Sequence, residues 1–220
     1  MTRHFRIVNG AKLVLGLEFV LLWLGVPTII LAFRLAPYMF VFLWSATAYC
    51  AWIYRRHFWT GWRDLWRWEA VRWDNLRPIL IRWAICCVGL VILVAVMDPD
   101  RMFQLVRRRP DFVPFLLVLY PLLSALPQEF IFCSVFFKRY APFFPSDRWR
   151  ILASALTFAY AHVLFINWVA PVLSLVAGFI FARTFARTRS LALVAIEHGL
   201  YGNALFLVGL GWYFYGGAHG

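Results

Sequence analysis

Three ionisable side chains lie in apolar stretches where hydrocarbon side chains would be expected. Glu129 lies in the segment Leu126–Cys133, and His162 and His198 lie in two later apolar runs. An ionisable group inside a membrane span costs on the order of 2.5–3.5 kcal/mol on insertion scales and is therefore a functional candidate. One carboxylate and two imidazoles on neighbouring helices predict a single polar site suited to general acid–base chemistry.

Residues one helical turn from these groups share their helix faces. They are Cys133 after Glu129, Phe158 before His162 and Tyr201 after His198, and Asn203 follows His198 by five positions. For any single residue, a buried polar group bonded to a neighbouring helix is the simpler interpretation. The set taken together favours a functional site.

Composition assigns the chain to a class. The 220 residues are 63% hydrophobic with a mean hydropathy of +0.72, which leaves too little polar surface for a water-soluble particle. We predict an all-α, multi-pass transmembrane bundle of about 7–8 helices that forms one integral membrane domain over 1–220. We expect it in the inner membrane of a bacterium, with the lipid bilayer as a partner. The four cysteines show no C-x-x-C spacing and indicate no zinc ribbon or disulfide framework.

The apolar runs give the expected helices. They cover 13–33, 36–54, 78–97, 112–140, 151–168, 170–184 and 190–210. Residues 112–127 and 128–140 form either one span or two separate helices. This alternative leaves the number of membrane crossings around 98–140 open.

Residues 55–77 differ from the spans that flank them. Four tryptophans recur there at helical spacing with four arginines between them: Trp59, Trp62, Trp66, Trp73 and Arg56, Arg63, Arg67, Arg72. The pattern predicts an amphipathic helix in the headgroup plane on the cytoplasmic side. Stacking on single-stranded nucleic acid is the alternative for such a pattern. The flanking spans argue against it, so we expect no nucleic-acid partner.

Three segments resemble the ordered motifs of the CAAX-protease and bacteriocin-processing (CPBP) family of intramembrane proteases. The segments are Gln128-Glu129-Phe-Ile-Phe-Cys133, Phe158-Ala-Tyr-Ala-His162 and His198-Gly-Leu-Tyr-Gly-Asn203. The family reads E-E-x-x-x-R, F-x-x-x-H and H-x-x-x-N. The resemblance covers residues 112–212, which we interpret as a protease-like core.

The resemblance implies hydrolysis of a peptide bond, in a peptide or protein substrate, within or at the membrane. Carried over to this chain, Glu129 is the base that activates water and His162 is its partner in holding that water. His198 and Asn203 stabilise the oxyanion. Gln128, Cys133, Phe158 and Tyr201 are supporting residues.

Three positions depart from the family pattern. Gln128 replaces the first glutamate, and Glu129 lies about 100° away on a helix, so it does not simply substitute for it. Cys133 replaces the arginine. Gly202 lies where the asparagine is expected, so either a local bulge brings Asn203 inward or Tyr201 donates in its place.

Several alternatives stay open. The favoured mechanism needs no cofactor, whereas a zinc metalloprotease would use His162 and His198 with Glu129 as ligands. A cysteine protease based on Cys133 would need a nearby cation, which the sequence does not place there. A noncatalytic scaffold or immunity protein is favoured by Gln128, and a proton-coupled transporter would use the same ionisable residues as a relay.

Overall fold

The apolar runs fold into helices throughout residues 9–215, the part of the chain that this computed structural model describes. No strand occurs among these residues. Six helical stretches within them are long and apolar enough to cross a membrane: Lys12–Ala32, Ala36–His57, Trp73–Met97, Pro110–Arg139, Val169–Thr188 and Leu191–Val208. A further helix, α10 (Asp147–Ala161), packs among them. The chain is a multi-pass integral membrane protein with an all-α fold, as the sequence predicts.

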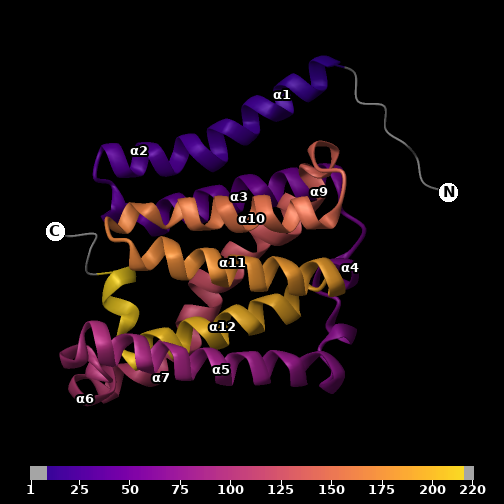
Figure 1. Cartoon of the computed structure of the whole chain (residues 1–220). Helices are drawn as coiled ribbons and strands as arrows, with labels where there is room; N and C mark the ends of the chain where they lie inside the picture. The colour runs from indigo at the N-terminus through magenta and orange to yellow at the C-terminus, as the bar shows by residue number, and fades with distance from the viewer. Residues whose placement is uncertain (1–8, 216–220) are drawn as a thin grey trace.

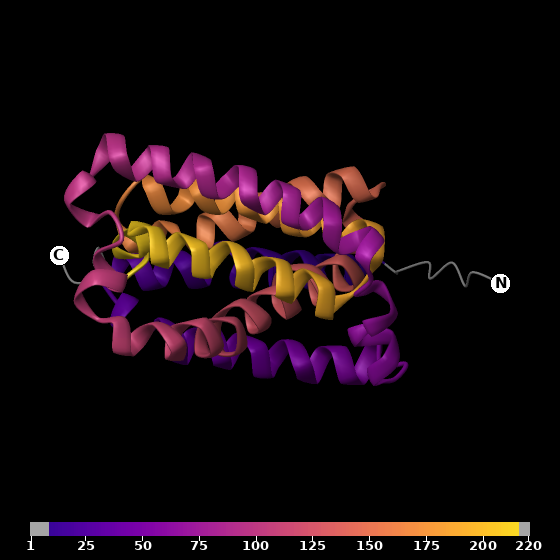
Figure 2. The same cartoon turned by 90° about the horizontal axis from the view of Figure 1, so that it is seen from below.

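Successive long helices lie side by side and alternate in direction (Figures 1 and 2). The first comprises α1 (Asn9–Val20), a π-helical segment η1 (Leu21–Gly25) and α2 (Val26–Ala32); then come α3 (Met39–His57), α5 (Trp73–Met97), the helix through residues 113–139, α10, α11 (Val169–Thr188) and α12 (Leu191–Val208). The turns 58–72, 140–146 and 189–190 lie at one end of the bundle. The turns 33–38, 98–109 and 162–168 lie at the other.

Helix α12 is the central element of the bundle. In its most apolar 18-residue stretch 67% of the residues are buried, against 11% in α5. Outward-facing side chains of α5 such as Val96 are 78% exposed. An exposed aliphatic surface of this kind suits contact with lipid chains. The residues that face α12 are therefore the ones that build the protein interior.

Residues 110–139 form one continuous span, which settles the alternative of one helix or two. Within it, α7 (Val113–Tyr120) is followed by π-helical η6 (Pro121–Ala125), short α8 (Leu126–Glu129), π-helical η7 (Phe130–Val135) and α9 (Phe136–Arg139). Prolines at 121 and 127 lack the N–H that a regular α-helix would use. A π-helical turn changes which side chains face a neighbour and is frequent at functional sites. Here two such turns flank the motif Gln128-Glu129.

Two glycines let α12 approach this span closely. A Cβ at Gly199 would lie 3.1 Å from Pro121, and a Cβ at Gly202 would lie 2.1 Å from the ring of Tyr120. Gly202 therefore leaves room for an aromatic ring, and nothing larger than hydrogen fits at that position.

The segment of tryptophans and arginines is not one helix. Between α3 and α5 the chain forms only the one-turn α4 (Trp62–Trp66) and a 3-10 turn η3 (Trp68–Ala70). Gly61 has φ 129° and Arg67 has φ 45°, so the backbone breaks on both sides of α4. The expected helix over 55–77 is thus replaced by a compact connection, on which the indoles of Trp62 and Trp73 are exposed.

Candidate active site

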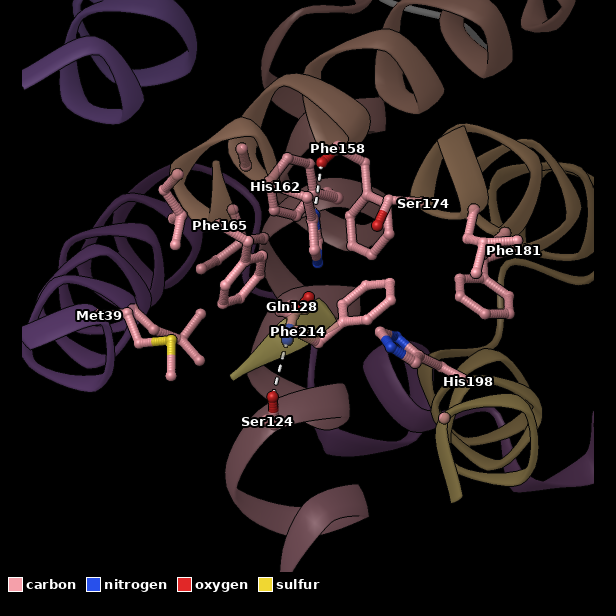
Figure 3. Close-up of a pocket in the computed structure, with 18 of the residues that line it drawn as sticks. Met39, Ser124, Gln128, Phe158, His162, Phe165, Ser174, Phe181, His198 and Phe214 are labelled. Carbon is pink, nitrogen blue, oxygen red and sulfur yellow. Dashed lines mark hydrogen bonds between the residues drawn. The ribbon is translucent and has the colours of Figure 1, made fainter. Parts of the chain in front are cut away.

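A cavity of about 580 Å³ opens between the helices that the three motifs predict. Most of its lining is apolar, and it is drawn from the helix portions nearer the end with the turns 33–38 and 162–168. Polar groups enter it at a few points, of which Gln128, His162 and His198 come from the three motifs. Figure 3 shows these groups around one space, with Phe214 between the two histidines. No residue of 55–77 lines it.

Gln128, and not Glu129, faces this cavity. Its amide Nε2 donates a hydrogen bond to Ser124 Oγ at 2.9 Å, one turn earlier in the same helix. The bond leaves the amide oxygen free to accept. In Figure 3 the Gln128 amide lies beneath the ring of His162. The position that holds the first glutamate in the family motif is therefore a neutral hydrogen-bonding group here.

His162 lies at the end of α10, where the helix stops. Its Nδ1 lies 2.7 Å from the carbonyl oxygen of Phe158. A carbonyl only accepts, so Nδ1 carries the proton and Nε2 of a neutral ring keeps a lone pair. Figure 3 shows the second ring nitrogen directed toward Gln128. The backbone carbonyl of Phe158 thus fixes the orientation of the His162 ring.

Glu129 and His198 form a buried pair. Glu129 is 1% exposed, and its Oε1 lies 2.7 Å from His198 Nδ1. The carboxylate does not line the cavity, which differs from the expectation that Glu129 holds the reacting water. The cause is helix geometry: adjacent helix residues point about 100° apart. With Gln128 on the cavity, Glu129 lies behind His198.

Cys133 fills the position of the missing arginine by bonding to the same carboxylate. Its thiol donates to Glu129 Oε2 at 3.1 Å. The two oxygens of Glu129 are therefore both partnered, one by an imidazole and one by a thiol. No cation at position 133 is needed to satisfy the buried group.

Neither predicted substitute for the family asparagine reaches His198. Asn203 donates from Nδ2 to the carbonyl oxygen of Leu117 at 3.1 Å. Tyr201 packs its ring edge-on against Phe181, with centroids 5.7 Å apart. The hydroxyl that does reach the imidazole is that of Tyr120, which lies 2.9 Å from His198 Nε2.

Aromatic rings hold both imidazoles in place. The Phe158 ring lies 4.6 Å from the His162 ring and 5.8 Å from the His198 ring, between centroids. Phe181 stacks on His198 at 4.5 Å with an interplanar angle of 19°. The two histidines that are 36 positions apart in sequence thus border the same aromatic side chain. This convergence is the one that the sequence predicts.

The alternative zinc set of His162, His198 and Glu129 is not arranged as a group of ligands. Within residues 9–215, no group of three or more His, Cys, Asp or Glu side chains is arranged to hold a metal ion. Both nitrogens of His198 have partners, and Nδ1 of His162 is bonded to Phe158. The residues present do not fit the His162, His198 and Glu129 zinc set.

Sequence reasoning missed Tyr120 and Ser124. Both lie in an apolar run upstream of the first motif, and no family motif includes them. One signal was available: Gly202 at the asparagine position indicates that a bulky group from another helix fills that space. The identity of that group depends on packing between segments about 80 residues apart.

Comparison with protein families agrees with this arrangement. Residues 110–204 match the family model described as type II CAAX prenyl endopeptidase Rce1-like. Neither the comparison with curated proteins nor the comparison with solved structures gave a match. The matched range contains Gln128, Glu129, His162 and His198. Residues 110–204 of this membrane protein, less than half of the chain, are therefore similar to the type II CAAX prenyl endopeptidases that the Rce1-like model describes.

Proposed function

We propose that the chain is an intramembrane endopeptidase that hydrolyses a peptide bond in the cavity bordered by His162, His198 and Gln128. The observation that carries this proposal is the meeting of two imidazoles and an amide in one cavity inside an apolar bundle. Polar groups in such a place are costly, and the family match gives a reason for them.

Water is activated by His162 in this mechanism. Nε2 of the neutral ring accepts a proton from a water molecule that also donates to the Gln128 amide oxygen. The water oxygen forms a bond to the peptide carbonyl carbon, and the carbonyl π pair moves to the oxygen. When the tetrahedral intermediate collapses, the C–N bond breaks and His162 returns its proton to the leaving amine.

Glu129 acts through His198 as a positioning residue. Its carboxylate accepts a hydrogen bond from Nδ1–H and so fixes the orientation of the imidazole beside the reacting carbonyl. The fixed imidazole then supports the group that donates to the negative charge developing on the carbonyl oxygen. Glu129 thereby keeps a role in the reaction, although it does not hold the reacting water itself.

The substrate is an apolar peptide segment or a lipid-modified peptide. Apolar side chains line most of the cavity around the polar groups, among them Ile30, Phe42, Leu43, Leu90, Ile131 and Leu205. The name of the matched family points to peptides that end in a prenylated CAAX sequence. The cavity accepts either class on physical grounds, so a test needs both.

The test uses the full chain in lipid nanodiscs with two matched peptides. One carries a farnesylated cysteine in a C-terminal CAAX sequence and the other has the same sequence without the lipid. Mass spectrometry of the products reports cleavage of either. We expect His162→Ala to lower kcat by about 10²–10⁴-fold and Glu129→Gln by up to about 10⁴-fold. Unchanged cleavage in both variants removes the proposal.

A noncatalytic peptide-binding protein is the second candidate, and Gln128 is the observation that favours it. If the reaction requires a carboxylate at the cavity, the neutral amide leaves a binding site without hydrolysis. Gln128→Glu distinguishes the two functions. Cleavage that appears only in this variant identifies the natural chain as a binder, whereas cleavage by the natural chain identifies an enzyme.

Metal dependence has its own experiment. The proposed mechanism uses side chains alone, so treatment with a strong chelator such as 1,10-phenanthroline leaves kcat unchanged. Elemental analysis of the untreated protein accompanies the assay. Loss of activity on chelation, with recovery on added Zn²⁺, contradicts the metal-free mechanism and supports a metalloprotease.

A further inference from the structure

We infer that Tyr120 is the oxyanion donor of this site, in the place where the family motif has an asparagine. This inference rests on the proposed function. The donor comes from the end of α7, on a different helix from His198. This replacement of the asparagine by Tyr120 depends on Gly202, which lies one helical turn after His198.

The first step is steric. Residues four apart on a helix lie above one another on the same face, so a side chain at 202 would project beside His198. A Cβ there would lie 2.1 Å from Tyr120 Cε1, 2.3 Å from Cζ and 2.2 Å from the hydroxyl oxygen. The phenol ring thus occupies the volume that an asparagine at 202 would use.

The second step is the hydrogen bond. Tyr120 OH lies 2.9 Å from His198 Nε2, and His198 Nδ1 lies 2.7 Å from the Glu129 carboxylate. When Nε2 carries a proton, Nε2–H donates to the phenol oxygen. The phenol proton is then free to point at a substrate carbonyl. A hydroxyl that itself accepts a hydrogen bond is polarised and donates more strongly.

The third step is orientation. Tyr120 and His198 both line the cavity that holds Gln128 and His162. The Tyr120 ring is held on one side by Phe206, with centroids 5.2 Å apart, and edge-on by His198 at 6.0 Å. Because these contacts hold the Tyr120 ring in place, its hydroxyl stays beside the His198 imidazole. In this arrangement the Tyr120 hydroxyl donates to the substrate carbonyl oxygen, and His198 orients that hydroxyl through the Nε2 contact.

The test begins with Tyr120→Phe, which removes only the hydroxyl. We expect kcat to fall by about 10²–10³-fold, the usual loss for one oxyanion-hole donor, with little change in KM. Tyr160→Phe is the matched control, because its hydroxyl bonds to Thr28 at 2.8 Å and does not line the cavity. An unchanged kcat in Tyr120→Phe overturns the inference and leaves the proposed function intact.

A rescue experiment separates catalysis from packing. Gly202→Asn alone clashes with the ring, and Tyr120→Ala alone removes the donor, so both are inactive. The double variant places an asparagine in the vacated space, and we expect at least about 10-fold more activity than in Tyr120→Ala. If the double variant is no more active than Tyr120→Ala, the inference that Tyr120 replaces the asparagine is wrong. If the natural chain does not cleave, the same variants are made in the Gln128→Glu background, and no cleavage there overturns both proposals.

An independent observation concerns a second cavity. We propose that a cleft of about 410 Å³ between α5 and α11 binds the phosphate of a membrane lipid. Its lining includes three guanidinium groups, Arg82, Arg183 and Arg187, and no acidic side chain. Arg82 is paired with the buried Glu197 at 2.7 Å. Within residues 9–215, Arg183 and Arg187 have no acidic partner within ion-pair distance, and both are exposed.

The position of the cleft selects a lipid as the ligand. It involves the first turns of α5 and the last turns of α11, at the bundle end with the turns 58–72 and 189–190. Arginine near a span end extends toward headgroups, and basic pockets between transmembrane helices bind anionic headgroups. Pro78, Ile79 and Phe179 supply apolar walls beside the arginines, where an acyl chain would lie.

Native mass spectrometry of the detergent-purified chain tests this site. Phosphatidylglycerol is the probe, and a glycosyl diacylglycerol without phosphate is the control lipid. We expect Arg183→Gln/Arg187→Gln to retain at least about 10-fold less phosphatidylglycerol, whereas Arg107→Gln/Arg108→Gln at the opposite end retains the natural amount. Equal retention by both double variants, or equal retention of the two lipids, contradicts the proposal. Displacement of the lipid by millimolar inorganic phosphate would identify a free-anion site instead.

Discussion

At the scale of single residues, the site is organised around one buried carboxylate. Glu129 has a partner on each oxygen, His198 Nδ1 at 2.7 Å and Cys133 Sγ at 3.1 Å. A buried charge is tolerated when its hydrogen-bonding capacity is satisfied. Cys133 therefore has a structural role: its thiol supplies the donor that the second oxygen of Glu129 needs. Comparison with the family arginine alone does not reveal this role.

A pair of substitutions at Cys133 tests this reason. Cys133→Val keeps the volume but leaves Glu129 Oε2 without a donor, so we expect a loss of about 1–3 kcal/mol in the free energy of unfolding. Cys133→Ser keeps a donor and should lose less. Thermal unfolding in one detergent compares the two. Equal stability of the Val and Ser variants would mean that the thiol does not support the carboxylate.

At the scale of elements, the contact between α12 and the span 110–139 sets the site. Gly199 faces Pro121 and Gly202 faces Tyr120, so two α12 positions without side chains meet the two residues at the junction of α7 and η6. The π-helical turn η6 then carries the chain into Gln128 and Glu129. A tight approach at these glycines fixes the distance between the carboxylate and His198.

Alanine substitutions at three glycines should show a graded effect. Gly202→Ala forces a Cβ to 2.1 Å from the Tyr120 ring, and overpacking of this kind costs about 1–3 kcal/mol. Gly199→Ala meets Pro121 at 3.1 Å and should cost less. Gly89→Ala on α5 has no neighbour within 4 Å and should gain up to about 1 kcal/mol from helix propensity. Thermal unfolding measures all three, and equal melting temperatures would refute the close approach.

A polar contact joins α1 to the end of the span 110–139. Arg139 donates to both oxygens of Glu18 at 3.0 and 2.5 Å, and the Tyr140 hydroxyl donates to the same carboxylate at 2.9 Å. Glu18 therefore serves packing between elements, and it does not line the cavity.

A double-mutant cycle with Glu18→Gln and Arg139→Gln should give a coupling of about 0.5–3 kcal/mol in unfolding free energy. The exposed pair Arg63 and Glu69, with side chains 86% and 57% exposed, is the control and should show much weaker coupling. Additive effects of the Glu18 and Arg139 variants would show that the first helix is held by apolar contacts alone.

At the scale of the whole molecule, the sequence predicts the framework better than the directions of side chains within it. Long apolar runs become helices because a chain in lipid must satisfy its own backbone hydrogen bonds, so their number and approximate ends follow from composition. The convergence of His162 and His198 follows from the motif order. The side of the helix that carries Glu129 depends on two π-helical turns, which have no periodic signal in the sequence.

Two further differences between the sequence predictions and the structure have physical causes that cannot be seen in a local sequence pattern. The spacing of indoles in 55–77 fits a helix, yet the backbone turns at Gly61 and Arg67 to join two long helices in a short distance. The partner of His198 is Tyr120, 78 positions away, because Gly202 leaves space for a ring. Contacts between distant segments decided both outcomes.

The alternation of the long helices predicts the sidedness of the protein in the membrane. The turn 58–72, with its dense arginines, and Arg187 lie at one end, and Arg107–Arg109 lie at the other (Figure 1). The heavier load of basic residues favours the cytoplasmic side, so the end with 58–72 should face the cytoplasm and the cavity should lie nearer the opposite face. This placement argues against delivery of substrate to the cavity along the tryptophan and arginine segment.

Cysteine labelling measures this directly. Thr60→Cys and Arg107→Cys place exposed thiols at the two ends, whereas the natural cysteines are buried or half-buried within the helices. A membrane-impermeant maleimide added to intact cells should label Arg107→Cys, and Thr60→Cys should react only after the membrane is opened. The unaltered chain gives the background. Labelling of both variants in intact cells would contradict the alternating arrangement, and the reverse pattern would place the basic end outside and turn the cavity toward the cytoplasm.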